Sequence, residues 1–299
     1  KGQRLVMASR MTTQALPVLE AESPLVQSGV PGTDGKQSYE EVYARAMGAL
    51  RAPSVGKVLD VTPDEIKVQY ADGRVENHDL YNNFPFNRKT FIHQTPVVKP
   101  GDVVQPDQLL AHSNYTDKNG ATGLGKNART AYVAWQGKNF EDATVISESF
   151  AKKMSSEHMY QHELEISDKT KLGKKNFIQL FPGKFDKETL KRLDDNGVVK
   201  PGTVVNYGDP LILGTSQKES AYNKVHKQGQ AGHSDASIVW DHHDNGVVTD
   251  VVMGKTGPTV VVKAASPMQI GDKMSGRYGD KGVIADIIPD HEMPHDADG

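Results

Sequence analysis

The segment at residues 271–282 (Gly-Asp-Lys-Met-Ser-Gly-Arg-Tyr-Gly-Asp-Lys-Gly) combines flexible backbone with positive charge. Its four glycines allow unusual backbone angles and a close approach of the main chain to a ligand. Lys273 and Lys281 can therefore reach a polyanion without bulky neighbours, and lysine acts on phosphate as a mobile point charge. Chemistry alone leaves two interpretations open, a phosphate-contacting loop and an ordinary basic surface loop.

Glu141 and Asp142 form a second candidate site, because they are adjacent carboxylates that follow Asn139 and Phe140. Such a pair could meet a metal ion carried by a substrate. Neighbouring residues on an extended chain point in different directions, so one would face the site and the other would support it. The alternative is a plain solvated pair.

Two further patterns fail as sites. Residues 254–256 (Gly-Lys-Thr) lack the earlier glycine and the following helix of a phosphate-binding loop, so we expect a hairpin tip. Residues 241–244 (Asp-His-His-Asp) offer metal-ligand types, but four consecutive side chains do not easily converge on one ion. The following Asn245-Gly246 favours a turn, and we expect a solvated loop there.

Composition excludes several classes of protein. The chain has 299 residues, 35 Lys and Arg, 38 Asp and Glu, and no Cys, which excludes thiolate zinc sites, disulfide scaffolds and cysteine nucleophiles. A net charge of −3 means that any nucleic-acid contact must come from local clusters. No stretch is apolar enough for a membrane span. The ends of the sequence suggest a piece of a longer polypeptide or one part of a split subunit.

The elements that would position these residues are mostly short strands, typical of a mainly β fold with few short helices. We expect strands at 56–62, 65–71, 130–136, 144–148, 157–166, 247–253, 259–263 and 282–288. Helices are predicted at 39–50 after a Ser38 capping box, at 187–195 after Asp186 and ending at Gly197, and through Lys153 after Ser147.

One pattern occurs twice. Residues 97–101 and 198–202 both read Val-Val-Lys-Pro-Gly, and each is followed by a Val-Val pair, an Asp and a Leu. Each copy predicts a strand, a turn and a second strand. A reused turn and a duplicated domain both explain the repetition.

Taken together, residues 125–132, 135–142, 147–148 and 271–282 resemble the β subunit of multisubunit DNA-directed RNA polymerases. Residues 4–17, 24–29, 87–96 and 170–173 extend the resemblance, and the order and spacing of these anchors agree over essentially the whole chain. The similarity is to the central-to-late part of that subunit only.

The resemblance implies a double-psi β-barrel with an inserted, β-rich flap domain, also called the wall. It implies three segments: 1–156 as the hybrid-binding region and first part of the barrel, 157–268 as the flap, and 269–299 as the closing barrel segment with the two lysines. The tip of the flap is expected to be a short hairpin near residues 254–258. Docking of a sigma factor through a tip helix is therefore not expected, and the short tip favours a divergent large-bacteriophage enzyme or a split fragment.

The resemblance also assigns roles to individual residues. Lys273 and Lys281 match the lysines that touch the RNA 3′ region and the incoming nucleotide, and Glu141 and Asp142 match the acidic pair near the second, nucleotide-borne Mg²⁺. Contacts to the nucleotide or to RNA are expected from four further residues, Arg4, Arg10, Gln14 and Arg277.

Two departures affect these contacts. Thr13 stands where the family has an Arg, which puts one transcript-phosphate contact in doubt. Arg10 replaces a usual Asn and could restore the positive charge nearby.

The family's primary Mg²⁺ loop, with three aspartates, belongs to a β′ subunit, and no Asp-x-Asp-x-Asp pattern occurs here. The resemblance thus predicts half of a nucleotidyltransferase site, inactive alone. Its expected partners are a β′-like chain, other β-derived chains, template DNA and the transcript, in the cytoplasm and without a membrane. Two alternatives stay open: a non-catalytic β-barrel module that binds nucleic acid or a partner, and a structural repeat protein.

Overall fold

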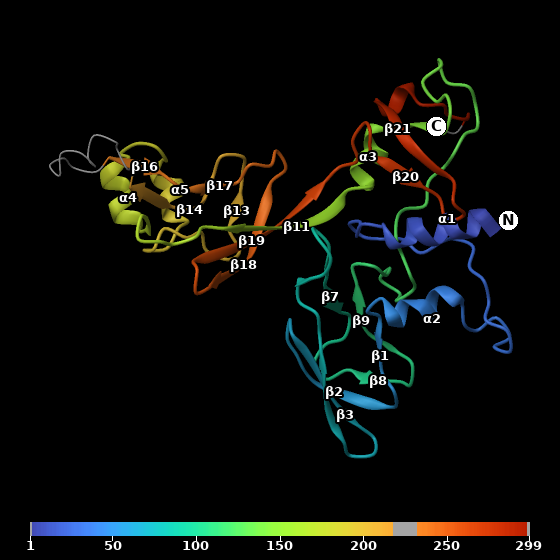
Figure 1. Cartoon of the computed structure of the whole chain (residues 1–299). Helices are drawn as coiled ribbons and strands as arrows, with labels where there is room; N and C mark the ends of the chain where they lie inside the picture. The colour runs from blue at the N-terminus through green and yellow to red at the C-terminus, as the bar shows by residue number, and fades with distance from the viewer. Residues whose placement is uncertain (1, 218–231, 298–299) are drawn as a thin grey trace. The chain divides into compact units, whose positions relative to one another are not determined.

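The structure is a computed structural model that describes residues 2–217 and 232–297 (Figure 1). It divides into two compact units, Lys1–Glu157 together with Ser266–Gly299, and His158–Ala265. Strands dominate both units and the helices are short, which confirms the mainly β fold class. The double-psi barrel and the three-segment division stay predictions.

The first unit contains a four-stranded antiparallel sheet in the order β4-β3-β2-β8. Its strands are β2 (Gly56–Val61), β3 (Glu65–Tyr70), β4 (Val75–Asp79) and β8 (Val103–Val104). Alternation along β2 and β3 buries Val58, Ile66 and Val68 in one core. A turn at Asp72-Gly73 joins β3 to β4, with Gly73 at a φ of 84° that favours glycine.

Two smaller sheets and two helices complete this part of the first unit. The sheets contain β1 (Leu50–Arg51), β7 (Gln94–Pro96) and β9 (Leu109–Ser113), and β5 (Phe84–Pro85) with β6 (Phe91–Ile92). Helix α1 (Gly2–Thr13) buries no residue. Helix α2 (Tyr39–Ala46) begins at the predicted capping box, because Ser38 accepts a hydrogen bond from the Glu41 amide and the Glu41 side chain accepts one from the Ser38 amide.

A separate three-stranded sheet of the first unit joins segments distant in sequence, in the order β10-β21-β20. Strand β10 (Ala143–Ser147) runs parallel to β21 (Lys281–Ile288), and β20 (Lys273–Ser275) runs antiparallel to β21. Helix α3 (Glu148–Lys153) follows β10, capped by Ser147 as predicted, and a 3-10 turn (Asp290–Glu292) follows β21.

The second unit has a four-stranded sheet and two small sheets around one core. The large sheet, in the order β11-β19-β18-β13, contains β11 (Ser156–Glu163), β13 (Val204–Val205), β18 (Gly246–Met253) and β19 (Pro258–Ser266). The small sheets contain β12 (Thr170–Leu172), β15 (Gly214–Gln217) and β16 (His233–Asp235), and β14 (Pro210–Ile212) with β17 (Ile238–Val239). Helices α4 (Lys174–Leu180) and α5 (Lys187–Lys191) add Phe177 and other apolar side chains to the core around Trp240.

The two Val-Val-Lys-Pro-Gly segments occupy equivalent places in the two units. β8 pairs with the start of the β2–β3 hairpin, and β13 pairs with the start of the β18–β19 hairpin. Both hairpins carry a β-bulge at the same point, where Asp60 and Asp250 accept a hydrogen bond from the next amide. The shared pairing and bulge show that the similarity extends beyond a turn. The hairpin precedes the Val-Val-Lys-Pro-Gly segment in one unit and follows it in the other, so the order of the two parts along the chain is reversed.

Some sequence predictions are wrong. Residues 130–136 form no strand, and the helix expected at 39–50 ends at Ala46, because Gly48 takes a φ of 95°. Helix α5 ends at Lys191, so Gly197 lies in a later turn instead of ending the helix. Helices α1 and α4 were not predicted, and α4 begins after Gly173, which has no side chain to cap it.

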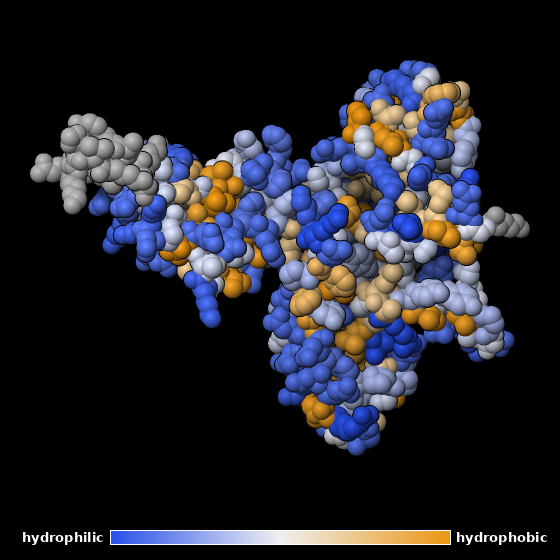
Figure 2. Space-filling view, in the orientation of Figure 1, coloured by the Kyte–Doolittle hydropathy of each residue, from blue (hydrophilic) through white to orange (hydrophobic). Residues whose placement is uncertain are grey.

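Within the described residues, no helix is both long and apolar enough to pass through a membrane. On the visible face of the molecule, hydrophobic residues form small spots separated by hydrophilic ones (Figure 2).

Candidate functional site

The β20–β21 hairpin positions the two lysines of the glycine-rich segment. Lys273 lies opposite Val283, and Ser275 lies opposite Lys281, so both lysines occupy one face of the hairpin as diagonal neighbours. Diagonal neighbours on antiparallel strands are about 7–8 Å apart at the backbone, within reach of one bound polyanion. Both lysines are exposed, and the connecting turn closes through a 3.2 Å hydrogen bond from the Gly276 amide to the Asp280 carbonyl.

The acidic pair lies beside this hairpin. Strand β10 begins directly after Asp142, and the Val283 amide donates to the Asp142 carbonyl at 3.2 Å. Gly282 permits this approach, because a Cβ at that position would overlap the Asp142 carbonyl oxygen. Glu141 and Asp142 take φ angles of 47° and 57°, so the chain turns sharply here and leaves both residues exposed.

A small scaffold fixes this acidic turn. Gln136 and Gly137 both have positive φ, and the Lys138 amide donates to the Trp135 carbonyl at 2.8 Å. Asn139 accepts from the Trp135 amide at 2.9 Å and donates to the Val133 carbonyl at 2.6 Å. These bonds order a segment that has no regular secondary structure.

An ion pair ties the same turn to β21. Lys138 Nζ lies 2.7 Å from the Asp286 carboxylate, and this hydrogen bond from Lys138 is the largest cause that lowers the pKa of Asp286. Asp286 occurs on the strand that begins with Lys281, so the acidic turn and the lysine hairpin share one support.

Helix α1 and Gln14, the residue that follows it, bring further predicted residues to the hairpin. Lys273 Nζ donates to Gln14 Oε1 at 2.7 Å, which joins two of the residues matched by the family resemblance. Gly279, at a φ of 87°, packs against α1 so closely that a Cβ there would lie 2.8 Å from the Arg4 carbonyl oxygen. Arg4 and Arg10 are both exposed on α1. Because each residue turns the helix by about 100°, the two side chains point in directions about 120° apart around the helix axis.

Arg277 differs from the lysines because its guanidinium already has partners. It donates to Glu40 Oε1 at 3.1 Å and to the Tyr278 hydroxyl at 3.1 Å, and the Glu40 side chain is only 14% exposed. The turn of the hairpin is thereby connected to α2. In this structure Arg277 therefore holds the turn of the hairpin against α2.

The structure therefore gathers the sequence-predicted residues around one hairpin, with one gap. Lys273 contacts Gln14, and Lys281 adjoins the glycine that meets Asp142. Across residues 2–217 and 232–297, no hydrogen bond or ion pair joins the carboxylates of Glu141 or Asp142 to either lysine. Sequence reasoning missed the Lys138–Asp286 and Arg277–Glu40 pairs, because nothing in a single sequence indicates which distant charges meet.

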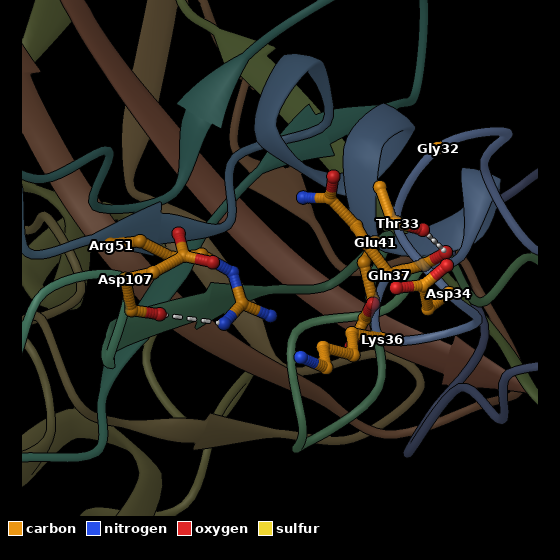
Figure 3. A pocket seen from close by; sticks show the side chains of 8 residues that line it. All are labelled: Gly32, Thr33, Asp34, Lys36, Gln37, Glu41, Arg51 and Asp107. Carbon is orange, nitrogen blue, oxygen red and sulfur yellow. Dashed lines mark hydrogen bonds between the residues drawn. The ribbon is translucent and has the colours of Figure 1, made fainter.

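A separate cavity of about 470 Å³ lies in the first unit (Figure 3). It is lined by Gly32, Thr33, Asp34, Lys36, Gln37, Glu41, Arg51 and Asp107. Arg51 donates to the Asp107, Asn119 and Gly120 carbonyls, and Glu41 belongs to the α2 capping box. Two charged groups of this cavity, Arg51 and Glu41, are thus already bound within the protein. None of the sequence-predicted site residues lines the cavity.

The hairpin site has the chemistry of a surface that binds polyanions. Exposed ammonium groups at Lys273 and Lys281 suit phosphate, and the exposed carboxylates of Glu141 and Asp142 suit a hard cation such as Mg²⁺. Both types of group lie on segments joined by backbone hydrogen bonds. The arrangement can therefore hold a phosphate chain and an accompanying cation side by side.

Comparison with known proteins gives a consistent family assignment. Residues 52–299 match the family model described as RNA polymerase Rpb2, domain 6. The chain is 32% identical over 322 aligned positions to the DNA-directed RNA polymerase subunit beta of Clostridium botulinum, covering 100% of this chain and 25% of that protein. The subunits of the same name from Mycoplasmopsis synoviae and Acetivibrio thermocellus are each 31% identical, with 100% of this chain and 26% and 25% of those proteins covered. The chain thus spans about a quarter of the length of these curated relatives.

Proposed function

The chain belongs to the RNA polymerase Rpb2 domain 6 family, and from that premise we propose that it forms part of the catalytic core of a DNA-dependent RNA polymerase. It would contribute contacts to the RNA 3′ end and to the incoming nucleotide during transcription. The observation that carries the proposal is the meeting of three matched segments, since the α1 segment and the acidic turn each contact the lysine hairpin.

Lys273 and Lys281 would neutralise phosphate charge at the reacting end of the transcript. Their place on one face of a rigid hairpin lets both act on the same group, and the hydrogen bond from Lys273 to Gln14 holds the first lysine in position. Preorganised positive charge of this kind stabilises a transition state that accumulates negative charge. Arg4 and Arg10, exposed on α1, would add nucleotide or RNA contacts, and Arg277 would join them on release from Glu40.

Glu141 and Asp142 would face the Mg²⁺ that accompanies the nucleotide. The donor set fits this cation, because Mg²⁺ in such sites is held by one or two carboxylates together with substrate phosphates. When bound, the ion would polarise the phosphoryl group and neutralise its charge. The left-handed backbone at both residues keeps the carboxylates at the surface, and the Lys138–Asp286 pair keeps the turn against β21.

This arrangement supplies only part of an active site. The primary metal ligands would come from a β′-like partner, and the remaining β regions from other chains or chain segments. Template DNA and the transcript would complete the assembly, in the cytoplasm of the cell or of a phage-infected host. We propose that the chain alone does not extend RNA.

The second unit would correspond to the flap. Strands β18 and β19 are joined by the short turn Gly254–Gly257, where the Gly254 amide donates to the Gly257 carbonyl at 2.9 Å. A tip of this size offers no helix between β18 and β19 for an initiation factor. We therefore propose that a sigma factor does not dock through this hairpin, in keeping with a divergent, phage-type enzyme.

The experiment is extension of a primed RNA–DNA scaffold by the chain alone and by the chain assembled with its co-purifying partners. The proposal predicts extension only in the assembly, and loss of that extension when Lys281 is replaced by Ala. Robust extension by the isolated chain would contradict the partial-site proposal. An assembly that binds the scaffold and extends equally well with and without Lys281 would instead support the alternative, a non-catalytic binding module.

A further inference from the structure

One face of strand β11 in the second unit carries an unusual group of side chains. Because side chains alternate along a strand, His158, Tyr160 and His162 point to the same side. The loop between β17 and β18 meets this face, with the Tyr160 and His242 rings 4.0 Å apart and the His162 and Trp240 rings 5.6 Å apart. The cluster is separate from the hairpin site and lies entirely within His158–Ala265.

Three side chains of this cluster place potential metal ligands together. Within the described part of the chain, one ligand atom each of His162, Asp241 and His242 lies within 4.8 Å of the others. His242 Nε2 is 3.4 Å from Asp241 Oδ1. The three residues come from two elements distant in sequence, so the fold itself creates the cluster.

His162 supplies an independent indication of a missing partner. Its Nε2 atom is buried and has no hydrogen-bond partner in the structure. Buried ring nitrogens normally have a partner, and an unsatisfied one costs free energy. A cation at this position would satisfy that nitrogen.

We propose that His162, Asp241 and His242 form a Zn²⁺ site. Two imidazoles and a carboxylate are ligands that zinc accepts, and three protein ligands leave a fourth tetrahedral position for water. Imidazole nitrogen suits zinc far better than Mg²⁺, which prefers oxygen ligands. Ligation requires the three atoms to close to about 3.3 Å, the spacing that bonds of about 2.0–2.1 Å set in a tetrahedron. Asp241 lies on an exposed loop and can make that movement.

The proposed site would give residues 241–244 a role beyond the solvated loop that the sequence predicts. Four consecutive side chains do not converge here, in agreement with the sequence argument, since His243 leaves the cluster and stacks on Tyr207 at 5.0 Å. His162 from β11 supplies the ligand that the loop cannot provide. A bound ion would fasten β11 to the loop that precedes β18 and stabilise the second unit.

The test is Zn²⁺ binding to the full chain, measured by competition with a fluorescent chelator in buffer that contains excess Mg²⁺. The Mg²⁺ occupies carboxylate sites such as Glu141 and Asp142. We expect one zinc ion per chain, a higher melting temperature with zinc, and the intense visible absorption of tetrahedral Co²⁺ when Co²⁺ replaces it. His162→Ala and His242→Ala should each weaken zinc binding by at least about 100-fold, because loss of a ligand exceeds the 10–100-fold cost of removing an outer-shell partner.

His243→Ala is the matched control, since this neighbouring histidine faces away from the cluster, and it should bind zinc as the wild type does. Asp241→Asn serves as a second ligand variant that leaves the buried residues unchanged. Equal zinc affinity in the wild type, Asp241→Asn and both ligand-histidine variants would overturn the proposal. So would an equal loss in His243→Ala, because that result would indicate nonspecific histidine binding.

Discussion

The carbonyl oxygen of Asp142 occupies the space that a Cβ on Gly282 would fill. The Val283 amide donates to the same carbonyl at 3.2 Å, so the acidic turn and the lysine hairpin meet at backbone level. A glycine at position 282 is thereby a geometric requirement of the site. It explains why the sequence places a glycine directly after Lys281, where the strand otherwise favours a side chain.

Gly282→Ala should displace the acidic turn. The added methyl overlaps backbone, which cannot yield as a flexible side chain can, and overpacking of this kind costs about 1–3 kcal/mol. We expect a lower melting temperature and weaker RNA extension by the assembled enzyme. Gly125→Ala is the control, because a Cβ at Gly125 would have nothing within 4 Å. Equal melting temperatures for the two variants would show that the close approach of Gly282 does not exist in solution.

Lys273→Ala and Lys281→Ala should slow extension while leaving assembly intact. Both side chains are exposed, so their removal leaves the core unchanged, and loss of a transition-state charge contact corresponds to a rate reduction on the order of 100-fold. Single-turnover extension rates at saturating nucleotide measure this effect. Lys255→Ala, on the Gly254–Gly257 turn of the second unit, should extend RNA at the wild-type rate. A wild-type rate for both hairpin variants would remove the lysines from the proposed mechanism.

The fold class and most strands followed from local pattern. β-Branched alternation predicts β2, β3 and β18, and the Ser38–Glu41 capping box predicts the start of α2, because these signals act within a few residues. Residues 130–136 carry a similar apolar pattern but form no strand, since no neighbouring segment pairs with them. Strand formation depends on a partner, which the local pattern does not specify.

For the candidate site, too, the sequence showed the residue types but not the contacts between distant segments. The glycine-rich segment and the acidic pair were visible as residue types, and the family resemblance indicated their roles. Their contact through Gly282, and the support from Lys138 and Asp286, depend on the parallel pairing of β10 with β21. The His162–Asp241–His242 cluster was missed for the same reason, because its third ligand comes from another strand.

Asp142→Ala should raise the Mg²⁺ or nucleotide concentration needed for half-maximal extension and leave scaffold affinity unchanged. The carboxylate would act only once nucleotide and ion are present, whereas scaffold binding depends on dispersed phosphate contacts that weaken with salt. Extension against Mg²⁺ at saturating nucleotide measures the first effect. Asp168→Ala, a similarly exposed aspartate of the second unit, is the control. An unshifted Mg²⁺ curve together with a lower melting temperature would assign Asp142 to holding the turn.

Glu22 is the carboxylate whose ionisation most clearly supports the first unit. Burial is the largest single influence and raises its pKa, but hydrogen bonds from the Asn127 amide and side chain and from Lys153 together outweigh it and lower the pKa to about 2. Lys153 Nζ lies 2.9 Å from the carboxylate, and the Asn127 amide donates at 2.9 Å. The ionised form therefore links residues 22, 127 and 153 of the first unit.

The sign of the pH dependence follows from this lowered pKa. A folded pKa of about 2, below the ordinary glutamate value of about 4.5, means that Glu22 stabilises the fold fully above about pH 4.5. That stabilisation is lost as the pH falls from about 4.5 towards 2, because the unfolded chain takes up the proton first. With the side chain 32% exposed, we discount the full shift to a contribution on the order of 2 kcal/mol.

Glu22→Gln keeps the size of the side chain and removes its charge, so it should lower the free energy of unfolding at pH 7 by that amount. Urea unfolding at several pH values should show the gap between Glu22→Gln and the wild type closing as the pH falls from 4.5 to 2. Glu20→Gln, two residues away and exposed, should follow the wild type at every pH. A gap that stays constant between pH 7 and pH 2 would mean that the glutamine disturbs packing and that the charge of Glu22 contributes nothing.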